Sequence, residues 1–396
     1  MPISLAYVFW EFWLFYIRKL YVESIKWTIL RVRTPKEILK TPKSMEQVFA
    51  AAHASYTFGI KPYDKYWKGK VEDWHSFDMV GHAGGVSFFI RINDTFRNLI
   101  ESAIYAQYPE AEVEVVDDYT EVFPAVLPNK TYDIFGADLI LAKDDAYPIR
   151  TYPYFEAMVA EEKVDTMAGF TEAMSHLKGE ETLWIQILIR PIGEKTTDWP
   201  KRAQKTLEDA IGRKKVETPG FLFGVFLFLK NLALAPFQQP DWSALETPKQ
   251  EKVALTVFTK GEQEIFRSIE DKISKLAFEG VVRYIYIDHK DAFTRSNVAA
   301  INGAFRQFND ERKNGLKPNI PVMTIAKQPF KSKRLYFKKR TIYDRYRLRK
   351  IPEKKLVLNT EELASLFHFP TTIVEAPMLK RVEAKKGEPP LTLPIE

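Results

Sequence analysis

"WHSFDMVGHAGGVSFFIRINDTFRNLIESAIYAQYPEAEVEVV", residues 74–116, is the stretch that decides the fold. Its first two apolar runs flank GHAGG, whose glycines permit the positive φ angles of a tight turn, so the pattern predicts a β-hairpin. An amphipathic helix follows, with Asn93 or Asp94 as its N-cap, and AEVEVV then predicts another strand. The order strand, strand, helix, strand is part of a ferredoxin-like split βαβ unit.

A second α/β unit follows downstream. Its pattern predicts a strand at 253–258, a helix at 262–278, a strand at 280–288 and a helix at 294–308. Between the two units, TLWIQILIRP at 182–191 is almost wholly apolar, which indicates a strand buried on both faces.

These patterns predict an α+β fold with two ferredoxin-like mixed-sheet lobes, an N-terminal apolar and aromatic helix, and an extended C-terminal arm. The expected division is a membrane-associating helical segment at 1–34, a first α/β lobe at 35–195, a helical and apolar insert at 196–250, a second α/β lobe at 251–330, and a basic arm with a Pro-rich docking tail at 331–396.

The composition limits the kinds of catalytic and binding site that the chain can form. Of 396 residues 45% are hydrophobic, enough for a sizeable core, and the chain has no cysteine, which excludes disulfides, thiolate metal sites and cysteine nucleophiles. The sequence contains no P-loop, G-x-S-x-G or H-E-x-x-H motif. We therefore predict no catalytic, cofactor or metal site. One enzyme alternative remains, a metal-dependent nuclease that uses Asp138, Asp144 and Asp145, although paired acids more often form a solvated turn.

The first 27 residues are dense in aromatic side chains. The apolar run from Ile3 to Ile17 is interrupted by Glu11 and is shorter than the ~20 residues of a membrane span. Indole and phenol rings favour the lipid headgroup zone, and basic residues suit anionic lipid. The pattern predicts an interfacial helix or an anchor that joins other helices; a buried packing helix is the alternative. The predicted membrane-anchoring residues are Trp10, Trp13, Tyr16, Arg18, Lys19 and Trp27.

A second apolar stretch, Gly220–Phe237, fits either an interfacial or re-entrant membrane helix or a buried helical hairpin.

Residues 331–355 hold twelve Lys or Arg and two acids, a local charge of +10 in a chain whose net charge is +6. Arg345, Arg347 and Arg349 alternate as on one face of a strand. Interleaved aromatics could stack on bases, so nucleic acid, a partner protein and a lipid surface all stay open as targets. The candidate binding residues are Lys331, Lys333, Arg334, Lys338, Lys339, Arg340, Arg345, Arg347, Arg349 and Lys350.

After this arm, Asn359 and Glu362 predict the cap of a brief helix, and an extended Pro-rich run follows it. Such a run fits a docking segment or an unstructured tail.

Several strings together resemble one family, the amino-terminal region of membrane-linked, conjugation-type (type IV secretion-like) ATPases, especially long versions from small-genome candidate-phylum bacteria. The resemblance spans roughly residues 33–396 and rests on PKEILKTPKSMEQVFAAAH, GKVEDWHSFDMVGHAGGVSFFIR, FRNLIESAIYAQYPEAEVEVVDDYT, FGADLILAKDDAYPIRTYPYFE, LWIQILIRPIGE, FNDERKNGLKPN and LNTEELASLFHFP with EPPLTLP. None of these strings is catalytic. In the relatives, the last run leads into a RecA-like motor domain with a P-loop, whereas this sequence stops at Glu396 before any P-loop. Either the motor is a separate polypeptide or the chain is a piece of a longer one.

The resemblance implies a non-enzymatic structural component of a DNA or protein translocation machine. We expect an oligomer at the cytoplasmic face of the cell membrane that acts with a RecA-like ATPase in trans and contacts lipid and DNA. The residues expected to dock the ATPase are Leu366, Phe367, His368, Phe369, Pro370, Pro389 and Pro390. The alternatives are a soluble nucleic-acid-binding protein that uses residues 331–355, and the nuclease described above.

Overall fold

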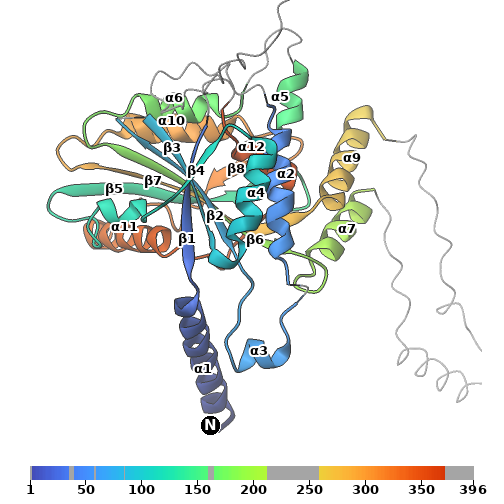
Figure 1. Ribbon diagram of the computed structural model, residues 1–396, viewed down its shortest axis with the longest axis horizontal. Coiled ribbons are helices and arrows are strands. Elements are labelled where there is room, and N and C mark those ends of the chain that lie inside the picture. The colour runs from blue at the N-terminus through green and yellow to red at the C-terminus, as the bar shows by residue number, and fades with distance from the viewer. Residues whose placement is uncertain are drawn as a thin grey trace, which may run out of the picture.

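The computed structural model describes residues 2–34, 40–57, 59–83, 85–158, 165–211 and 258–370. One nine-stranded sheet forms the centre of the molecule (Figure 1), in the order β4-β1-β3-β2-β6-β7-β5-β8, with β9 paired to β7. The strands are β1 (Trp27–Arg33), β2 (His75–His82), β3 (Gly85–Asn93), β4 (Glu112–Val116), β5 (Tyr132–Leu141), β6 (Thr182–Ile192), β7 (Ala277–His289), β8 (Leu316–Pro318) and β9 (Leu356–Asn359).

The stretch at 74–116 folds as its pattern predicts. Strands β2 and β3 form an antiparallel hairpin that closes at the pair His82 and Gly85, and Gly85 has a φ of +119°. The Asn93 side chain accepts a hydrogen bond from Thr95 N at 3.1 Å and so caps the turn that enters the following helix. Strand β1 was not predicted. It lies between β3 and β4, so the segment 1–34 is part helix and part sheet.

Strand β7 joins the two predicted units into one sheet. On one side it pairs with β6 along the whole of that strand, from Thr182 to Ile192. On the other side its first four residues pair with β9 and its last eight with β5. The α+β class is confirmed, and β6 is buried on both faces along nearly all of its length. The two mixed-sheet lobes are not confirmed, because strands of both units belong to one sheet whose pairings are all antiparallel.

Helices cover both faces of this sheet. Those described are α1 (Pro2–Ser24), α2 (Lys43–Ala52), α3 (Pro62–Tyr66), α4 (Arg97–Gln107), α5 (Tyr152–Met158), α6 (Ala168–Ser175), α7 (Trp199–Ala210), α9 (Lys260–Ser274), α10 (Arg295–Arg306), α11 (Lys331–Arg347) and α12 (Thr360–Leu366), with 3-10 turns at His53–Ser55, Asp94–Phe96 and Tyr119–Val122. The largest hydrophobic cluster joins the sheet to α2, α4, α6, α10 and α12. A second cluster holds α11 on the opposite face through Ile342, Tyr343 and Tyr346.

Helices α7 and α9 pack together at one end of the sheet, around Trp199 and Ile269 (Figure 1). Of the predicted insert at 196–250, only the part up to residue 211 is described. The apolar stretch Gly220–Phe237 lies outside the described residues, as does nearly all of the predicted strand at 253–258.

Candidate functional site

Helix α1 projects from the body of the protein with α3 at its side (Figure 1). The Trp13 indole nitrogen donates a hydrogen bond to Tyr66 O at 3.1 Å, and the Trp10 ring lies 5.8 Å from the ring of Tyr66. Gly69, just after α3, has a φ of +68°, and a β-carbon there would overlap the carbonyl oxygen of Ile17. Glycine therefore allows the backbone that follows α3 to touch the backbone of α1 directly.

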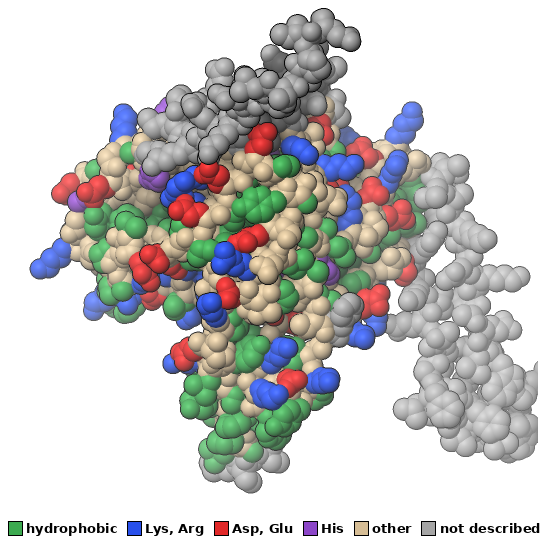
Figure 2. Space-filling model, viewed as in Figure 1, with side chains coloured by type: hydrophobic (Ala, Val, Ile, Leu, Met, Phe, Trp, Pro, Cys, Tyr) green, Lys and Arg blue, Asp and Glu red, His purple; other side chains and the backbone are tan. Residues whose placement is uncertain are grey.

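Beyond these contacts the first half of α1 is exposed and mostly apolar. Leu5, Phe9 and Phe12 each keep 69% of their surface accessible, and Phe15 and Tyr16 continue the row. A spacing of three and four residues places these side chains on one face of the helix. Figure 2 shows hydrophobic side chains gathered over this projection. Contiguous apolar surface of this kind is typical of sites that contact lipid or another macromolecule.

Of the predicted anchoring residues, Tyr16 lies in this exposed row, and Arg18 and Lys19 follow it toward the sheet. Trp10 is partly exposed, and Trp13 is half-buried against α3. Trp27 lies elsewhere, at the start of β1, where its ring centre is 4.8 Å from that of the tilted Trp74 ring and 3.8 Å from the Arg91 guanidinium. Trp27 is thus part of the body of the protein.

None of the helices in the described part of the chain combines the length and the apolarity needed to cross a bilayer.

Helix α3 brings basic side chains next to the apolar row, which the sequence reasoning missed. Lys61, Lys65 and Lys68 are exposed, together with Tyr63 and Trp67, which are 63% and 59% accessible. The signal in the sequence is KPYDKYWKGK at 61–70, where lysines alternate with aromatic residues. Figure 2 shows basic side chains at the border of the apolar projection.

The basic arm forms a helix, α11, so the prediction of a strand-like alternation of Arg345, Arg347 and Arg349 is wrong. The helix forms because Ile342, Tyr343 and Tyr346 share one face and are buried against the sheet.

The ten candidate cations of this arm do not form one surface. Lys331, Lys333 and Arg334 are exposed, near the exposed aromatic rings of Phe330 and Phe337. The middle group is engaged within the chain: Lys338 Nζ donates to Met323 O at 3.2 Å, Lys339 pairs with Asp133 at 2.5 Å, and Arg340 pairs with Asp344 at 3.2 Å. The nucleic-acid alternative therefore stays a prediction that rests on the first turn of α11.

The last four candidates lie where α11 ends. Arg345 pairs with Asp138 at 3.6 Å, the Arg347 guanidinium donates to Ala125 O at 3.3 Å, and buried Arg349 forms a two-pronged ion pair with Asp118. Lys350 keeps an exposed side chain, while its carbonyl oxygen accepts a hydrogen bond from Arg283 at 2.7 Å. Most of these groups therefore fasten the end of α11 to the sheet and to the segment between β4 and β5.

A layer of buried polar side chains lies beneath this end of α11. Arg283 pairs with Asp138 at 3.1 Å, and both side chains are almost fully buried. Asp78 accepts hydrogen bonds from Ser76 and, at 2.8 Å, from the Tyr119 hydroxyl. Burial raises the pKa of Asp78 to about 6, although the positive charge of Arg349 opposes the shift.

The raised pKa of Asp78 predicts a pH effect on stability. The folded state binds the carboxyl proton of Asp78 more tightly than the unfolded state does. The stabilisation that this protonation gives the folded state is therefore fully present below about pH 4 and is lost as the pH rises toward about 6. In Asp78→Asn this loss is absent. The free energy of unfolding of the variant relative to wild type should therefore improve by up to about 3 kcal/mol between pH 4 and pH 7. Urea titrations at both pH values measure it, and parallel pH profiles would contradict it.

The predicted docking residues of the C-terminal segment belong to the core of this chain. Leu366, Phe367, His368, Phe369 and Pro370 are buried. The Phe367 ring lies 5.4 Å from that of Phe77, and His368 Nε2 lies 2.9 Å from Asp165 Oδ1. These side chains are not a free docking surface. Pro389 and Pro390 lie outside the described residues.

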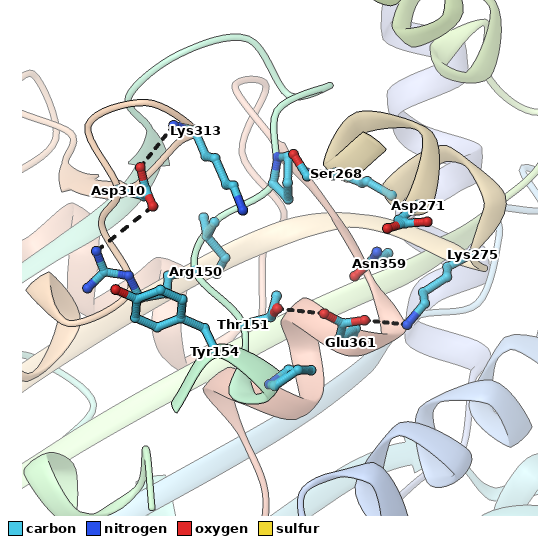
Figure 3. A pocket seen from close by; sticks show the side chains of 14 residues that line it. Arg150, Thr151, Tyr154, Ser268, Asp271, Lys275, Asp310, Lys313, Asn359 and Glu361 are labelled. Atoms are coloured by element: carbon cyan, nitrogen blue, oxygen red, sulfur yellow. Dashed lines mark hydrogen bonds and ion pairs between the residues drawn. The ribbon is translucent and has the colours of Figure 1, made fainter. Parts of the chain in front are cut away.

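A polar cleft of about 560 Å³ lies between α5, α9 and α12 (Figure 3). Each of its basic residues has an acidic partner: Arg150 with Asp310 at 3.9 Å, Lys272 with Glu362 at 3.1 Å, Lys275 with Glu46 at 3.2 Å, and Lys313 with Glu264 at 2.9 Å. Figure 3 shows Glu361 bridging Thr151 and Lys275. Because the charges compensate one another, the cleft does not indicate a particular ligand.

The three acids of the nuclease alternative make separate contacts. Asp138 pairs with Arg283, Asp144 accepts a hydrogen bond from Ala146 N at 2.9 Å, and Asp145 pairs with Arg202 at 3.0 Å. The described residues contain no group of three or more His, Cys, Asp or Glu side chains placed to hold a metal ion.

Comparison with known proteins adds a family assignment. No curated protein matches the chain. A family described as "Domain of unknown function (DUF8128)" matches residues 18–381, which include every strand of the sheet but not the exposed row from Leu5 to Tyr16. Because the match covers most of the sequence, the chain belongs to the DUF8128 family.

Proposed function

We propose that the chain is a non-enzymatic, membrane-associated structural component of a type IV secretion-like or conjugation-like machine that translocates DNA or protein. The observation that carries the membrane part is the exposed apolar row on α1, with Leu5, Phe9 and Phe12 accessible on a helix that projects from the body. In water such a row is unfavourable, and lipid would remove it from contact with water.

The dimensions of α1 support attachment to one leaflet. At about 1.5 Å per residue, the part of α1 from Pro2 to Trp13 is about 16 Å long, close to half of a ~30 Å hydrocarbon core. Helix α3 packs beside Trp10 and Trp13 and would then lie at the depth of the headgroups. The basic residues around α3 favour the cytoplasmic face.

The translocation part of the proposal rests on the resemblance of the sequence to the amino-terminal region of conjugation-type ATPases. In this proposal the motor is a RecA-like ATPase that acts in trans, and the sheet domain is a scaffold that assembles with further copies of itself.

The translocation part is tested by extracting the native complex from membranes with a mild detergent, purifying it through this chain, and identifying the co-purifying proteins by mass spectrometry. We expect a P-loop ATPase at a stoichiometric ratio, retained after a high-salt wash. Recovery of this chain alone would remove the translocation part and leave a self-assembling membrane scaffold.

A further inference from the structure

We infer that residues 61–70, the α3 segment, form a second membrane contact that binds anionic lipid headgroups. This inference rests on the proposed attachment of α1 to the membrane and adds to it the class of lipid. The segment carries four lysines and one aspartate, a local charge of +3.

The position of the segment is fixed by its packing on α1. Trp10 contacts both Tyr66 and Trp67, with ring centres 5.8 and 6.3 Å apart, and Gly69 allows the backbone contact with Ile17. Insertion of α1 into one leaflet therefore brings α3 to the same membrane surface in a fixed orientation. The two elements are distant in sequence but act as one unit.

The side chains of the segment suit the boundary between lipid and water. Tyr63 and Trp67 are exposed, and such rings favour the headgroup region. The lysine ammonium groups lie beside the rings: Lys68 Nζ is 5.4 Å from the Tyr63 ring centre, and Lys65 Nζ is 5.4 Å from that of Tyr66. Aromatic and basic groups together can hold a phosphate headgroup and the upper acyl chain at once.

The acids within the segment and just after it do not cancel this charge. Asp64 pairs with Lys68 at 2.9 Å, which leaves Lys61, Lys65 and Lys70 as the excess. Glu72 and Asp73 are buried and face the protein, where they accept hydrogen bonds from Thr57 at 2.6 Å and Asn93 at 2.8 Å.

The basic residues that follow α1, before and within β1, are engaged within the protein. Arg31 and Arg33 pair with Glu114 on the neighbouring strand at 3.3 and 3.2 Å, and Lys26 pairs with Asp94 at 2.8 Å. The basic surface left to meet lipid is therefore the α3 segment, together with Arg18 and Lys19 on α1 itself.

An anionic membrane explains this surface better than nucleic acid does. A nucleic acid would neutralise the lysines but would leave the apolar row of α1, which borders them, in water. A membrane satisfies both, because the acyl chains cover Phe9 and Phe12 while the headgroups meet Lys61 and Lys65.

The test is flotation of the full-length protein with vesicles of phosphatidylcholine alone and of equal parts phosphatidylcholine and phosphatidylglycerol. We expect tighter binding to the anionic vesicles. The variant Lys61→Gln/Lys65→Gln/Lys70→Gln, which removes the three lysines in excess, should lose roughly five-fold in partitioning per lysine, on the order of 100-fold in all, on anionic vesicles only. High salt should abolish the preference of the wild type.

A matched control is Lys178→Gln/Lys201→Gln/Lys205→Gln, which removes the same charge from exposed lysines on other elements. It should bind like wild type.

If wild type floats equally on both vesicle types, or if the α3 variant behaves like the control, the lipid preference is wrong although the α1 anchor stands. If wild type floats with neither, the membrane attachment itself is wrong. Retention of the α3 variant by anionic vesicles with loss of binding to single-stranded DNA would assign the lysines to nucleic acid.

Discussion

Replacement of Leu5, Phe9 and Phe12 together by serine is expected to release the protein from membranes. The three side chains are exposed in the protein and, in the proposed attachment, become buried in the acyl region. Burial of such a side chain contributes about 1.5–3 kcal/mol, so loss of all three should weaken partitioning by at least ~1,000-fold. The unfolding midpoint should stay near that of wild type, because these three side chains are 69% accessible and are not the ones that contact α3. Flotation with vesicles and thermal unfolding of the same samples measure both effects.

The matched control places serine at Val115, Val122 and Ile320, three exposed apolar residues on the body of the protein. This variant should float like wild type. Size-exclusion chromatography in detergent-free buffer tests the alternative that the apolar row joins copies of the chain. If the α1 variant converts a stable oligomer into a monomer without changing flotation, the row joins copies of the chain and the proposed lipid contact is wrong.

The variant Lys272→Met should lower the free energy of unfolding by about 3–5 kcal/mol. Lys272 and Glu362 pair at 3.1 Å with both side chains fully buried. Lys272 Nζ also donates to Val357 O at 3.0 Å, so it ties α9 to β9 as well as to α12. Burial raises the pKa of Glu362, and the charge of Lys272 opposes that shift. Without the lysine, Glu362 would be a buried carboxylate with no compensating cation, which is the source of the large expected loss.

Urea unfolding at neutral pH compares this loss of stability with the effects of two further variants. Lys313→Met removes a lysine whose partner, Glu264, has a 69% exposed side chain, and should cost less than ~1 kcal/mol. The double variant Lys272→Met/Glu362→Gln removes both charges and should recover much of the stability. Equal losses for Lys272→Met and Lys313→Met would show that the buried pair does not hold α9 and α12 together.

The sequence predicts local elements of this fold well. The hairpin of β2 and β3, helix α4 and strand β4 follow from turn residues, caps and periodicity within one short stretch. The same patterns do not say which strands become neighbours. The apolar run of β6 shows that both of its faces are buried, but its pairing with β7 depends on residues almost a hundred positions away. For this reason the division into two lobes is not confirmed.

The candidate site, like the fold, is predictable from the sequence only in part. The aromatic density of residues 1–27 predicts an interfacial helix or an anchor that joins other helices, and in this chain the row from Leu5 to Tyr16 is exposed. The contribution of α3 depends on a contact between Trp13 and Tyr66, which no local pattern encodes. The ion pairs of the basic arm within the chain could not be predicted for the same reason. The partners of its cations, such as Asp118 and Asp133, lie about two hundred residues earlier.

The position of β7 has a consequence for how the chain is made. Strands β5 and β6 leave the ribosome long before β7, which begins at Ala277, and β9 follows only at Leu356. Until then β6, apolar on both faces, presents an unpaired edge that invites association with other nascent chains. Pairings between such distant segments also slow folding. The centre of the sheet therefore closes only once β7 has been made, and the edge of β6 is open to other chains until then.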